Sequence, residues 1–227
     1  MSICFSESIC GFCAELNNTD QENNLLQKII TPNTGIESRV VYETDHFVVV
    51  PTLGALVEGY LLIISKAHYE SIRQIPEELF PEFENMVHKA KSVIASTYQK
   101  RVVCFEHGAV SCSNKFGGCI DHAHLHVIPC NETLSGAIQE FGMKLQPIPS
   151  LNTLLDAVGE NQPYLYWEDA DGSKYVIRDG FIPSQFFRKI IADHYSIAEQ
   201  WDWRQELNLK NLLETYRTLR PKFAEMP

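Results

Sequence analysis

Short stretches rich in β-branched and aromatic residues dominate the first 130 positions and predict β-strands. Between the third and the fourth stretch, apolar residues recur at steps of three and four, which indicates an amphipathic helix opened by Pro76. Its apolar positions are Leu79, Phe83, Met86, Val87, Ala90, Val93 and Ile94. The strands are expected at residues 39–43, 46–51, 60–65, 102–106 and 122–128. This pattern predicts an α+β fold, with an antiparallel meander of strands and one long crossing helix.

Weaker patterns predict elements elsewhere in the chain. Residues 20–30 predict a short helix, which the Thr-Pro-Asn-Thr-Gly run at 31–35 is expected to end. The later elements are a long connection over 131–160, a hairpin from 164–167 and 174–177, a helix from Gln185 capped by Ser184, and a last helix over 207–219.

We therefore divide the chain into two parts. Residues 1–130 form the core domain, and residues 131–227 form a C-terminal α/β extension. The extension is expected to pack on the core or at a dimer interface, and a substrate-selecting lid is the alternative.

Composition restricts the classes of partner. The 227 residues are 44% apolar, which is enough for one core and a modest second lobe. With 19 basic and 29 acidic residues the net charge is −10, which argues against non-specific binding to nucleic acid or to a membrane. No apolar run approaches the roughly 18 residues of a membrane span, and no signal peptide is expected. Seven cysteines, an odd number, favour the reducing cytoplasm over a disulfide framework.

The clearest chemical pattern is HAHLHVI at residues 122–128, where three histidines alternate with apolar residues. Because successive side chains of a strand point to opposite faces, His122, His124 and His126 share one face. Their first and last Cα atoms would be about 13 Å apart, so one metal ion with bonds of about 2 Å could hold two neighbours but not all three. A division of roles fits better, with one histidine structural and the others facing a substrate. Imidazole is a nucleophile and a proton donor near neutral pH, which suits covalent catalysis at phosphorus.

The run resembles the histidine-triad (HIT) family, whose pattern is His-x-His-x-His with apolar spacers and an apolar pair after it. Residues 41–51 resemble the entry strands of that family, and residues 59–68 resemble its strand ending in Pro-Lys-x-His, with Ser65 in place of proline. Residues 105–108 and 201–204 resemble blocks of larger bacterial members, which carry a C-terminal extension. The resemblance implies a nucleotidyl hydrolase or transferase. Its substrate would be a nucleotide conjugate or resemble a dinucleoside polyphosphate, and the protein would be a cytoplasmic homodimer.

The resemblance also implies roles for single residues. His124 would be the nucleophile that attacks the α-phosphorus and forms a covalent nucleotidyl-histidine intermediate, while its other ring nitrogen donates to the main-chain carbonyl of His122. His126 would stabilise charge on the phosphate or protonate the leaving group. Gly118 and Cys119 stand where the family has a Gln-Ser or similar pair that contacts phosphate.

A second chemical pattern is the CxxC pair of Cys10 and Cys13. Two thiolates at this spacing suit tetrahedral zinc, which needs two further ligands, although redox pairs and buried free thiols share the spacing. In zinc-binding histidine-triad proteins, and in the related galactose-1-phosphate uridylyltransferases, the histidine of the Pro-Lys-x-His block and the first triad histidine complete the site. These positions correspond to His68 and His122, so the resemblance implies a structural zinc there.

The sequence departs from the family pattern near the expected site. Tyr60 stands where many members carry a fourth histidine, and Thr52 or Pro51 lies near a common acidic ribose-binding position, which leaves purine-nucleotide preference and phosphoramidate-type activity open. His107 is either a compensating histidine or an exposed loop residue. Positive charge for a phosphate could come from Arg101, Lys115 or Arg188.

Two other classes of function stay open. One is a nucleotide-binding regulator with negligible turnover. The other is a metal-dependent enzyme that uses His122 and His124 as ligands of a catalytic ion.

Overall fold

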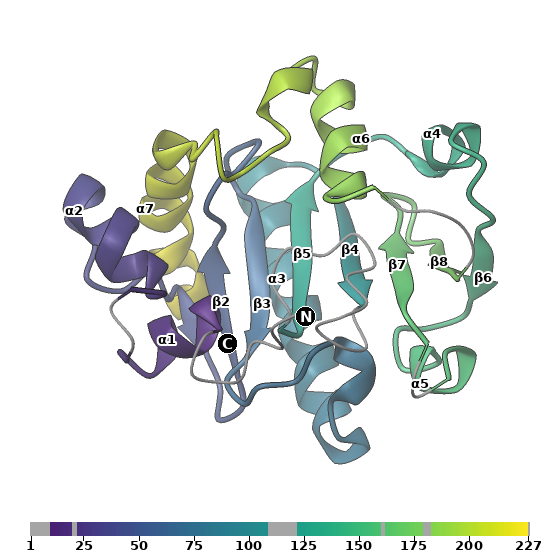
Figure 1. Ribbon diagram of the computed structural model, residues 1–227, viewed down its shortest axis with the longest axis horizontal. Coiled ribbons are helices and arrows are strands. Elements are labelled where there is room, and N and C mark those ends of the chain that lie inside the picture. The colour runs from purple at the N-terminus through teal and green to yellow at the C-terminus, as the bar shows by residue number, and fades with distance from the viewer. Residues whose placement is uncertain (1–9, 20–21, 109–121, 160–161, 179–182, 227) are drawn as a thin grey trace, which may run out of the picture.

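The computed structural model describes residues 10–19, 22–108, 122–159, 162–178 and 183–226 (Figure 1). Its described strands form one antiparallel sheet in the order β1-β2-β3-β5-β4-β7-β8-β6. The strands are β1 (Tyr42–Glu43), β2 (Phe47–Pro51), β3 (Leu61–Ser65), β4 (Val102–Gly108), β5 (His124–Pro129), β6 (Gln146–Ile148), β7 (Tyr164–Glu168) and β8 (Lys174–Ile177).

Helices cover both faces of this sheet. The α-helices are α1 (Gly11–Leu16), α2 (Thr31–Thr34), α3 (Phe80–Tyr98), α4 (Ser135–Glu140), α5 (Leu154–Ala157), α6 (Phe186–His194) and α7 (Leu209–Glu225). Shorter turns are the π-helix η2 (Leu26–Ile30) and the 3-10 helices η3 (Ile72–Gln74), η4 (Glu77–Leu79) and η5 (Ala198–Gln200). Within the described residues, no helix has both the length and the apolar character needed to cross a membrane.

The predicted α+β class with one long crossing helix is confirmed. The strand order differs from a simple meander, because β5 lies between β3 and β4. The 19-residue α3 connects β3 to β4 and crosses behind the sheet in Figure 1, so that β5 can return into the gap between them. This insertion puts the histidine-bearing strand at the centre, with β3 on one side and β4 on the other.

The sheet has an apolar core on each face. Leu125 and Val127 of β5 pack in the cluster with α3 and α7, as the sequence predicts for the face opposite the histidines. The other cluster contains residues of α1 and α6, together with Phe105 and Trp167 of the neighbouring strands. The histidines of β5 therefore lie on the α6 side of the sheet.

Some predicted local elements were wrong. The helix at residues 20–30 continues as α2 through Pro32 and ends only at Gly35, which adopts the left-handed conformation that favours glycine. Pro32 cannot donate a main-chain hydrogen bond, and it lies just after the π-helical turn η2, where the regular helical pattern is already interrupted. The predicted connection at 131–160 contains two short helices and the edge strand β6. Helix α6 begins at Phe186 with Gln185 at the N-cap, in place of the predicted cap at Ser184.

The C-terminal part continues the same sheet. Strands β7, β8 and β6 extend it beyond β4, with Cys104 to Gly108 of β4 pairing along the full length of β7. Helix α7 packs against α3 and β2, at the other end of the sheet. Residues from this part can therefore reach the central strands from two directions.

Candidate functional site

Strand β5 positions two of the three histidines side by side. The rings of His124 and His126 lie 4.8 Å apart between centroids, on the α6 side of the sheet. His126 is buried, whereas His124 is partly exposed. The strand pairs His124 with Ile64 and His126 with Leu62 of β3, so both backbones are held by the sheet ladder.

The orientation of His124 is set by a main-chain bond. Its Nδ1 lies 2.6 Å from the carbonyl oxygen of His122. A carbonyl only accepts hydrogen bonds, so Nδ1 carries the proton and Nε2 keeps its lone pair. Burial lowers the pKa of His124 to about 4, against the opposing effect of this bond. The ring is therefore neutral at pH 7 and suited to nucleophilic attack.

His126 is held between an aromatic ring and a hydroxyl group. Its ring stacks on Phe105 of β4, with centroids 4.1 Å apart and planes inclined by 12°. Its Nδ1 lies 2.6 Å from the hydroxyl oxygen of Tyr60. Burial, and then the neighbouring His124, His107 and Arg188 in that order, lower the pKa of His126 well below its ordinary value of 6.5.

His122 faces a different environment, just before β5 begins. Its Nε2 donates to the main-chain carbonyl of Ser65 at 2.8 Å, which leaves Nδ1 as a lone pair. This Nδ1 lies 3.3 Å from the Sγ of Cys10 and 3.5 Å from the Sγ of Cys13. The Nδ1 of His68 lies 3.3 Å from the Sγ of Cys13. Four groups that can ligate a metal thus converge from α1, the segment after β3 and the start of β5.

The geometry and chemistry of this cluster fit zinc. The four ligand atoms all lie within 4.8 Å of one another. Tetrahedral zinc, with bonds of about 2.3 Å to sulfur and about 2.0 Å to nitrogen, would separate a sulfur from a nitrogen by about 3.5 Å. The pKa of Cys10 is lowered to about 3, chiefly by a hydrogen bond from Cys13, against the opposing effect of burial. A thiolate at this position is the form that binds metal.

The remaining predicted residues fall into three groups. Gly118 and Cys119, with Lys115, lie outside the described residues. Arg101 is exposed and hydrogen-bonds to Asn131. In contrast, Arg188 is buried and donates to the Tyr60 hydroxyl at 3.5 Å.

The sequence left His107 as either a compensating histidine or an exposed loop residue, and the structure excludes the exposed loop. His107 lies on β4, buried against Phe105 and Phe187, because β4 continues to Gly108 while pairing with β7. Its buried Nε2 has no hydrogen-bond partner among the described residues. Burial lowers its pKa to about 3, so the ring is neutral at pH 7.

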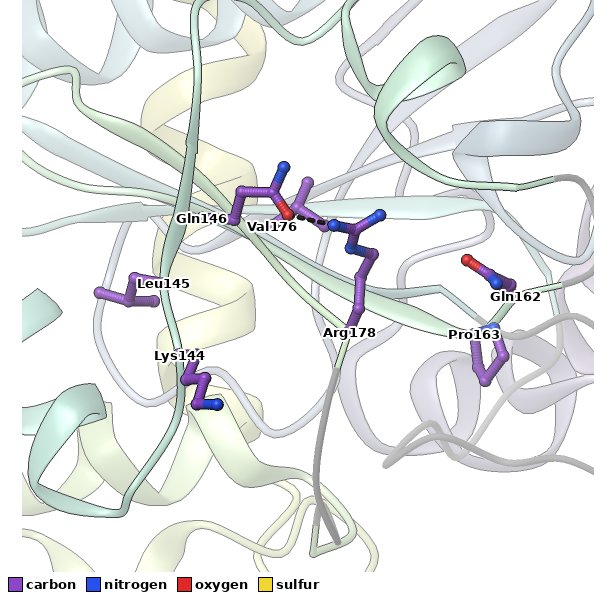
Figure 2. A pocket seen from close by; sticks show the side chains of 7 residues that line it. All are labelled: Lys144, Leu145, Gln146, Gln162, Pro163, Val176 and Arg178. Carbon is purple, nitrogen blue, oxygen red and sulfur yellow. Dashed lines mark hydrogen bonds between the residues drawn. The ribbon is translucent and has the colours of Figure 1, made fainter.

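A separate pocket lies at the edge of the sheet (Figure 2). It encloses about 540 Å³ between β6, β8 and their flanking segments, with Lys144, Gln146, Val176 and Arg178 in its lining. Arg178 points toward Gln146 and donates to it, and it also donates to the carbonyl of Ala157 at 3.0 Å. Val176 belongs to the core cluster on the α3 side, and the described lining includes no triad histidine. This pocket is thus distinct from the site around β5.

An antiparallel α+β sheet with a His-x-His-x-His run that leads into its central strand defines a histidine-triad protein. Residues 23–141, just over half of the chain, match the family model described as "Scavenger mRNA decapping enzyme C-term binding". The chain belongs to this family, within the histidine-triad proteins.

Curated relatives match different shares of this chain. CWF19-like protein 1 of Xenopus laevis is 28% identical over 178 residues, covering 73% of this chain and 31% of the relative. A CWF19-like protein 1 homolog of Caenorhabditis elegans is 25% identical over 225 residues, covering 91% of this chain and 37% of the relative. The chain thus spans about a third of the length of these relatives. An uncharacterized HIT-like protein of Methanocaldococcus jannaschii is 27% identical over 111 residues, covering 48% of this chain and 81% of the relative.

Solved structures of similar proteins carry histidine-triad titles. A member of the HIT family from Bacillus subtilis is 27% identical, with a TM-score of 0.36, and the match covers 45% of this chain and 69% of that structure. A HIT family protein from Bacillus anthracis is 18% identical, with a TM-score of 0.40, and the match covers 66% of this chain and 97% of that structure.

Proposed function

We propose that this protein is a nucleotidyl hydrolase or transferase that acts at the α-phosphate of a nucleotide conjugate. The observation that carries the proposal is the bond from Nδ1 of His124 to the carbonyl of His122, which leaves Nε2 as a free lone pair on the site face. His126 stands next to it, 4.8 Å away between ring centroids, as a proton donor or charge-stabilising group.

The reaction would run in two displacements. Nε2 of His124 attacks the α-phosphorus, the new N–P bond forms, and the bond to the leaving oxygen breaks. The leaving oxygen takes the Nε2 proton of His126 while Nδ1 of the same ring takes the hydroxyl proton of Tyr60, whose oxygen is then stabilised by Arg188. Water or another acceptor then attacks the phosphorus. The N–P bond breaks, its electron pair returns to His124, the proton of the attacking group passes to Nε2 of His126, and the Nδ1 proton returns to Tyr60.

The family description suggests which conjugates to test. Because it names a scavenger mRNA decapping enzyme, a cap dinucleotide belongs in the substrate panel beside a dinucleoside polyphosphate and an adenylylated amine. All three present an electrophilic α-phosphorus next to a leaving group.

The decisive experiment is to trap the nucleotidylated protein by acid quenching and to locate the adduct by mass spectrometry. We expect the adduct on His124 and no adduct or turnover in His124→Ala. His46→Ala is the matched control, since His46 is an exposed histidine engaged with Glu82 and should leave turnover unchanged. An adduct on another residue, or turnover in His124→Ala, would contradict the mechanism.

The same experiment separates the two other classes of function. A nucleotide-binding regulator, which the replacement of the fourth histidine by Tyr60 favours, would bind nucleotide without forming an adduct. A metal-dependent enzyme would lose its activity at chelator concentrations that leave the protein folded. Among the described residues, His124 belongs to neither group of side chains with metal-ligand spacing, which argues against this second class.

We also propose that Cys10, Cys13, His68 and His122 hold a structural zinc ion. The ion would tie α1 to the start of β5 and fix His122, whose carbonyl orients His124. Elemental analysis of the purified protein should find about one zinc per chain. Cys10→Ser should lose both metal and stability, whereas Cys104→Ala, at a buried cysteine outside the cluster, should keep its zinc. Unchanged zinc content in Cys10→Ser would exclude this site.

The predicted homodimer remains a separate proposal. Light scattering after size-exclusion chromatography tests it directly, because a monomeric mass would contradict it.

A further inference from the structure

Tyr60 occupies a buried position beside the triad. It lies immediately before β3, is fully buried, and places its hydroxyl oxygen 2.6 Å from Nδ1 of His126. The rings of the two residues are 5.7 Å apart between centroids and inclined by 56°, so the hydroxyl group makes the close approach. This hydrogen bond is the polar contact that links Tyr60 to the triad.

Arg188 of α6 reaches the same hydroxyl group from the C-terminal part of the chain. It is 97% buried, and its Nη1 donates to the Tyr60 oxygen at 3.5 Å. Its other nitrogens donate to main-chain carbonyls, Nε to Trp201 at 2.8 Å and Nη2 to Gly54 at 2.7 Å. These bonds fix the plane of the guanidinium group on both sides.

The charge of Arg188 has no acidic partner in the described part of the chain. None of the ion pairs formed there includes it. Carbonyl dipoles and the Tyr60 oxygen are its polar contacts. A buried cation without a counter-ion raises the electrostatic potential around it strongly, because little water screens it. That potential acts on the neighbouring His126, which stands between Tyr60 and His124.

Donor and acceptor chemistry favours one arrangement of the protons in this chain of contacts. Arginine is only a donor, so the Tyr60 oxygen accepts from Arg188, and Nδ1 of His126, 2.6 Å away, is the acceptor within reach of the Tyr60 proton. Burial raises the pKa of Tyr60 to about 12, so the hydroxyl proton is retained at neutral pH. With Nδ1 accepting, the single proton of neutral His126 resides on Nε2.

We infer that Tyr60 and Arg188 are positioning residues that hold His126 as the neutral tautomer protonated at Nε2. The inference rests on the proposed nucleotidyl transfer, in which this Nε2–H is the donor to the phosphate or to the leaving oxygen. Stacking on Phe105 sets the plane of the His126 ring, and the Arg188–Tyr60 pair sets which nitrogen carries the proton. The C-terminal part of the chain thereby takes part in the chemistry of the triad.

The first test reads the tautomer directly and needs no substrate. Long-range ¹H–¹⁵N correlation spectra of protein labelled with ¹⁵N-histidine distinguish protonated from unprotonated ring nitrogens, and His126→Gln assigns the signals. The wild-type spectrum should show His126 protonated at Nε2 and not at Nδ1. Tyr60→Phe, which removes only the hydroxyl group, should shift both nitrogens toward an average of the two tautomers.

A matched control comes from a second buried tyrosine. Tyr166 of β7 donates its hydroxyl to Glu168 at 3.1 Å and packs on the α3 side of the sheet, away from the histidines. Tyr166→Phe also loses one buried hydrogen bond, so it controls for stability, and it should leave the His126 signals unchanged. A wild-type His126 protonated at Nδ1, or a Tyr60→Phe spectrum identical to wild type, would overturn the inference.

The second test is kinetic. Tyr60→Phe should lower kcat at least about tenfold with little change in KM, as expected when proton donation in the transition state is impaired. Arg188→Lys keeps the charge but loses the planar fork, and it should lower kcat in the same way. Because Arg188 acts through Tyr60, the double variant should be no slower than the slower single variant. A multiplicative loss would show that the two residues act independently and would contradict the relay.

The two tests distinguish failure of this inference from failure of the proposed function. If the wild-type protein transfers no nucleotide, the proposed function is wrong, and the tautomer spectra still decide whether Tyr60 and Arg188 set the proton on His126. If the wild-type protein is active, but Tyr60→Phe leaves the His126 signals unchanged and the losses in kcat multiply in the double variant, this inference alone is wrong.

Discussion

A buried carboxyl group gives the clearest prediction about stability. Glu106 lies on β4 with its side chain on the face opposite the histidines, fully enclosed by the core. It accepts a hydrogen bond from the main-chain N–H of Ile72 at 2.7 Å and one from the hydroxyl of Tyr164 at 2.5 Å. Burial raises the pKa of Glu106 to about 8, and the two hydrogen bonds oppose this without cancelling it. The carboxyl is therefore protonated in the folded state at neutral pH.

The sign of the pH dependence follows from proton uptake in the two states. Above its ordinary pKa of 4.5, the unfolded Glu106 has lost its proton, while the folded protein keeps it up to about pH 8. Folding therefore binds a proton, and the free energy of unfolding falls by about 1.4 kcal/mol for each pH unit in that window. Between pH 5.5 and 7.5 the loss due to this one group is about 3 kcal/mol. The full contribution is present at low pH and is lost as the pH rises through 8.

Urea unfolding of wild type and Glu106→Gln across pH 5 to 9 measures this contribution as a difference. Glutamine cannot ionise, so the variant should lack the decline, and the two curves should converge or cross toward high pH. The buried histidines titrate in both proteins and cancel in the difference. Glu78→Gln, at an exposed position of η4, should follow the wild-type curve. Parallel curves for wild type and Glu106→Gln would mean that Glu106 is already ionised in the folded protein.

Three further predictions concern packing and backbone geometry, each measured by chemical denaturation. Leu125→Ala should cost about 2–5 kcal/mol by leaving a cavity on the α3 side of β5, and a loss below 1 kcal/mol would contradict full burial there. Arg39→Met should cost about 3–5 kcal/mol of unfolding free energy, because it leaves the buried Glu15 carboxylate without a counter-charge. Adding Glu15→Leu should recover most of that loss. If the losses of the two single variants add in the double variant, the pair does not form. Gly59→Ala should cost more than about 2 kcal/mol, because φ of Gly59 is +88° and an added Cβ would lie 2.6 Å from the ring of Tyr98. A neutral effect would mean that the backbone of this turn has a different conformation.

The period-two pattern was sufficient to predict the central strand and its two faces. In β5, the alternation of histidine with Leu125 and Val127 is a local property, and the structure places both apolar residues in the core cluster with α3. The approach of Cys10 and Cys13 to His68 and His122 was predicted from the family pattern, and the four ligand atoms do lie together. Spacing alone gave only the CxxC pair, because the two histidines come from segments far along the chain.

The elements that the sequence missed depend on long-range pairing. Strand β6 is three residues long, contains Pro147 and is mostly exposed, so it has neither the length nor the apolar alternation of a strand. Only its pairing with β8 makes it one. In the same way, the predicted strand ended at residue 106, whereas pairing with β7 extends β4 to Gly108 and buries His107.

The role of Arg188 shows the same limit in the site itself. Phe187 and Ile190, close to it in sequence, lie on the buried face of the amphipathic helix α6. An arginine in such a helix ordinarily points to water. Arg188 is buried because the carbonyls of Trp201 and Gly54 satisfy its donors. Trp201 opens the Trp-Asp-Trp-Arg block, whose Asp202 accepts from Gln185 at 3.0 Å and so ties the start of α6 to the same turn.

The charge distribution is compatible with the anionic substrate proposed above. A net charge of −10 repels phosphate over most of the surface, yet the site face contains neutral histidines and the buried cation of Arg188. Screening weakens the distant surface charges beyond about 8–10 Å, while the buried charge acts through protein at short range. Recognition of a phosphate would therefore depend on the few groups around His126. The C-terminal part, which supplies Arg188, would be needed for that recognition even though the triad itself lies in the first 130 residues.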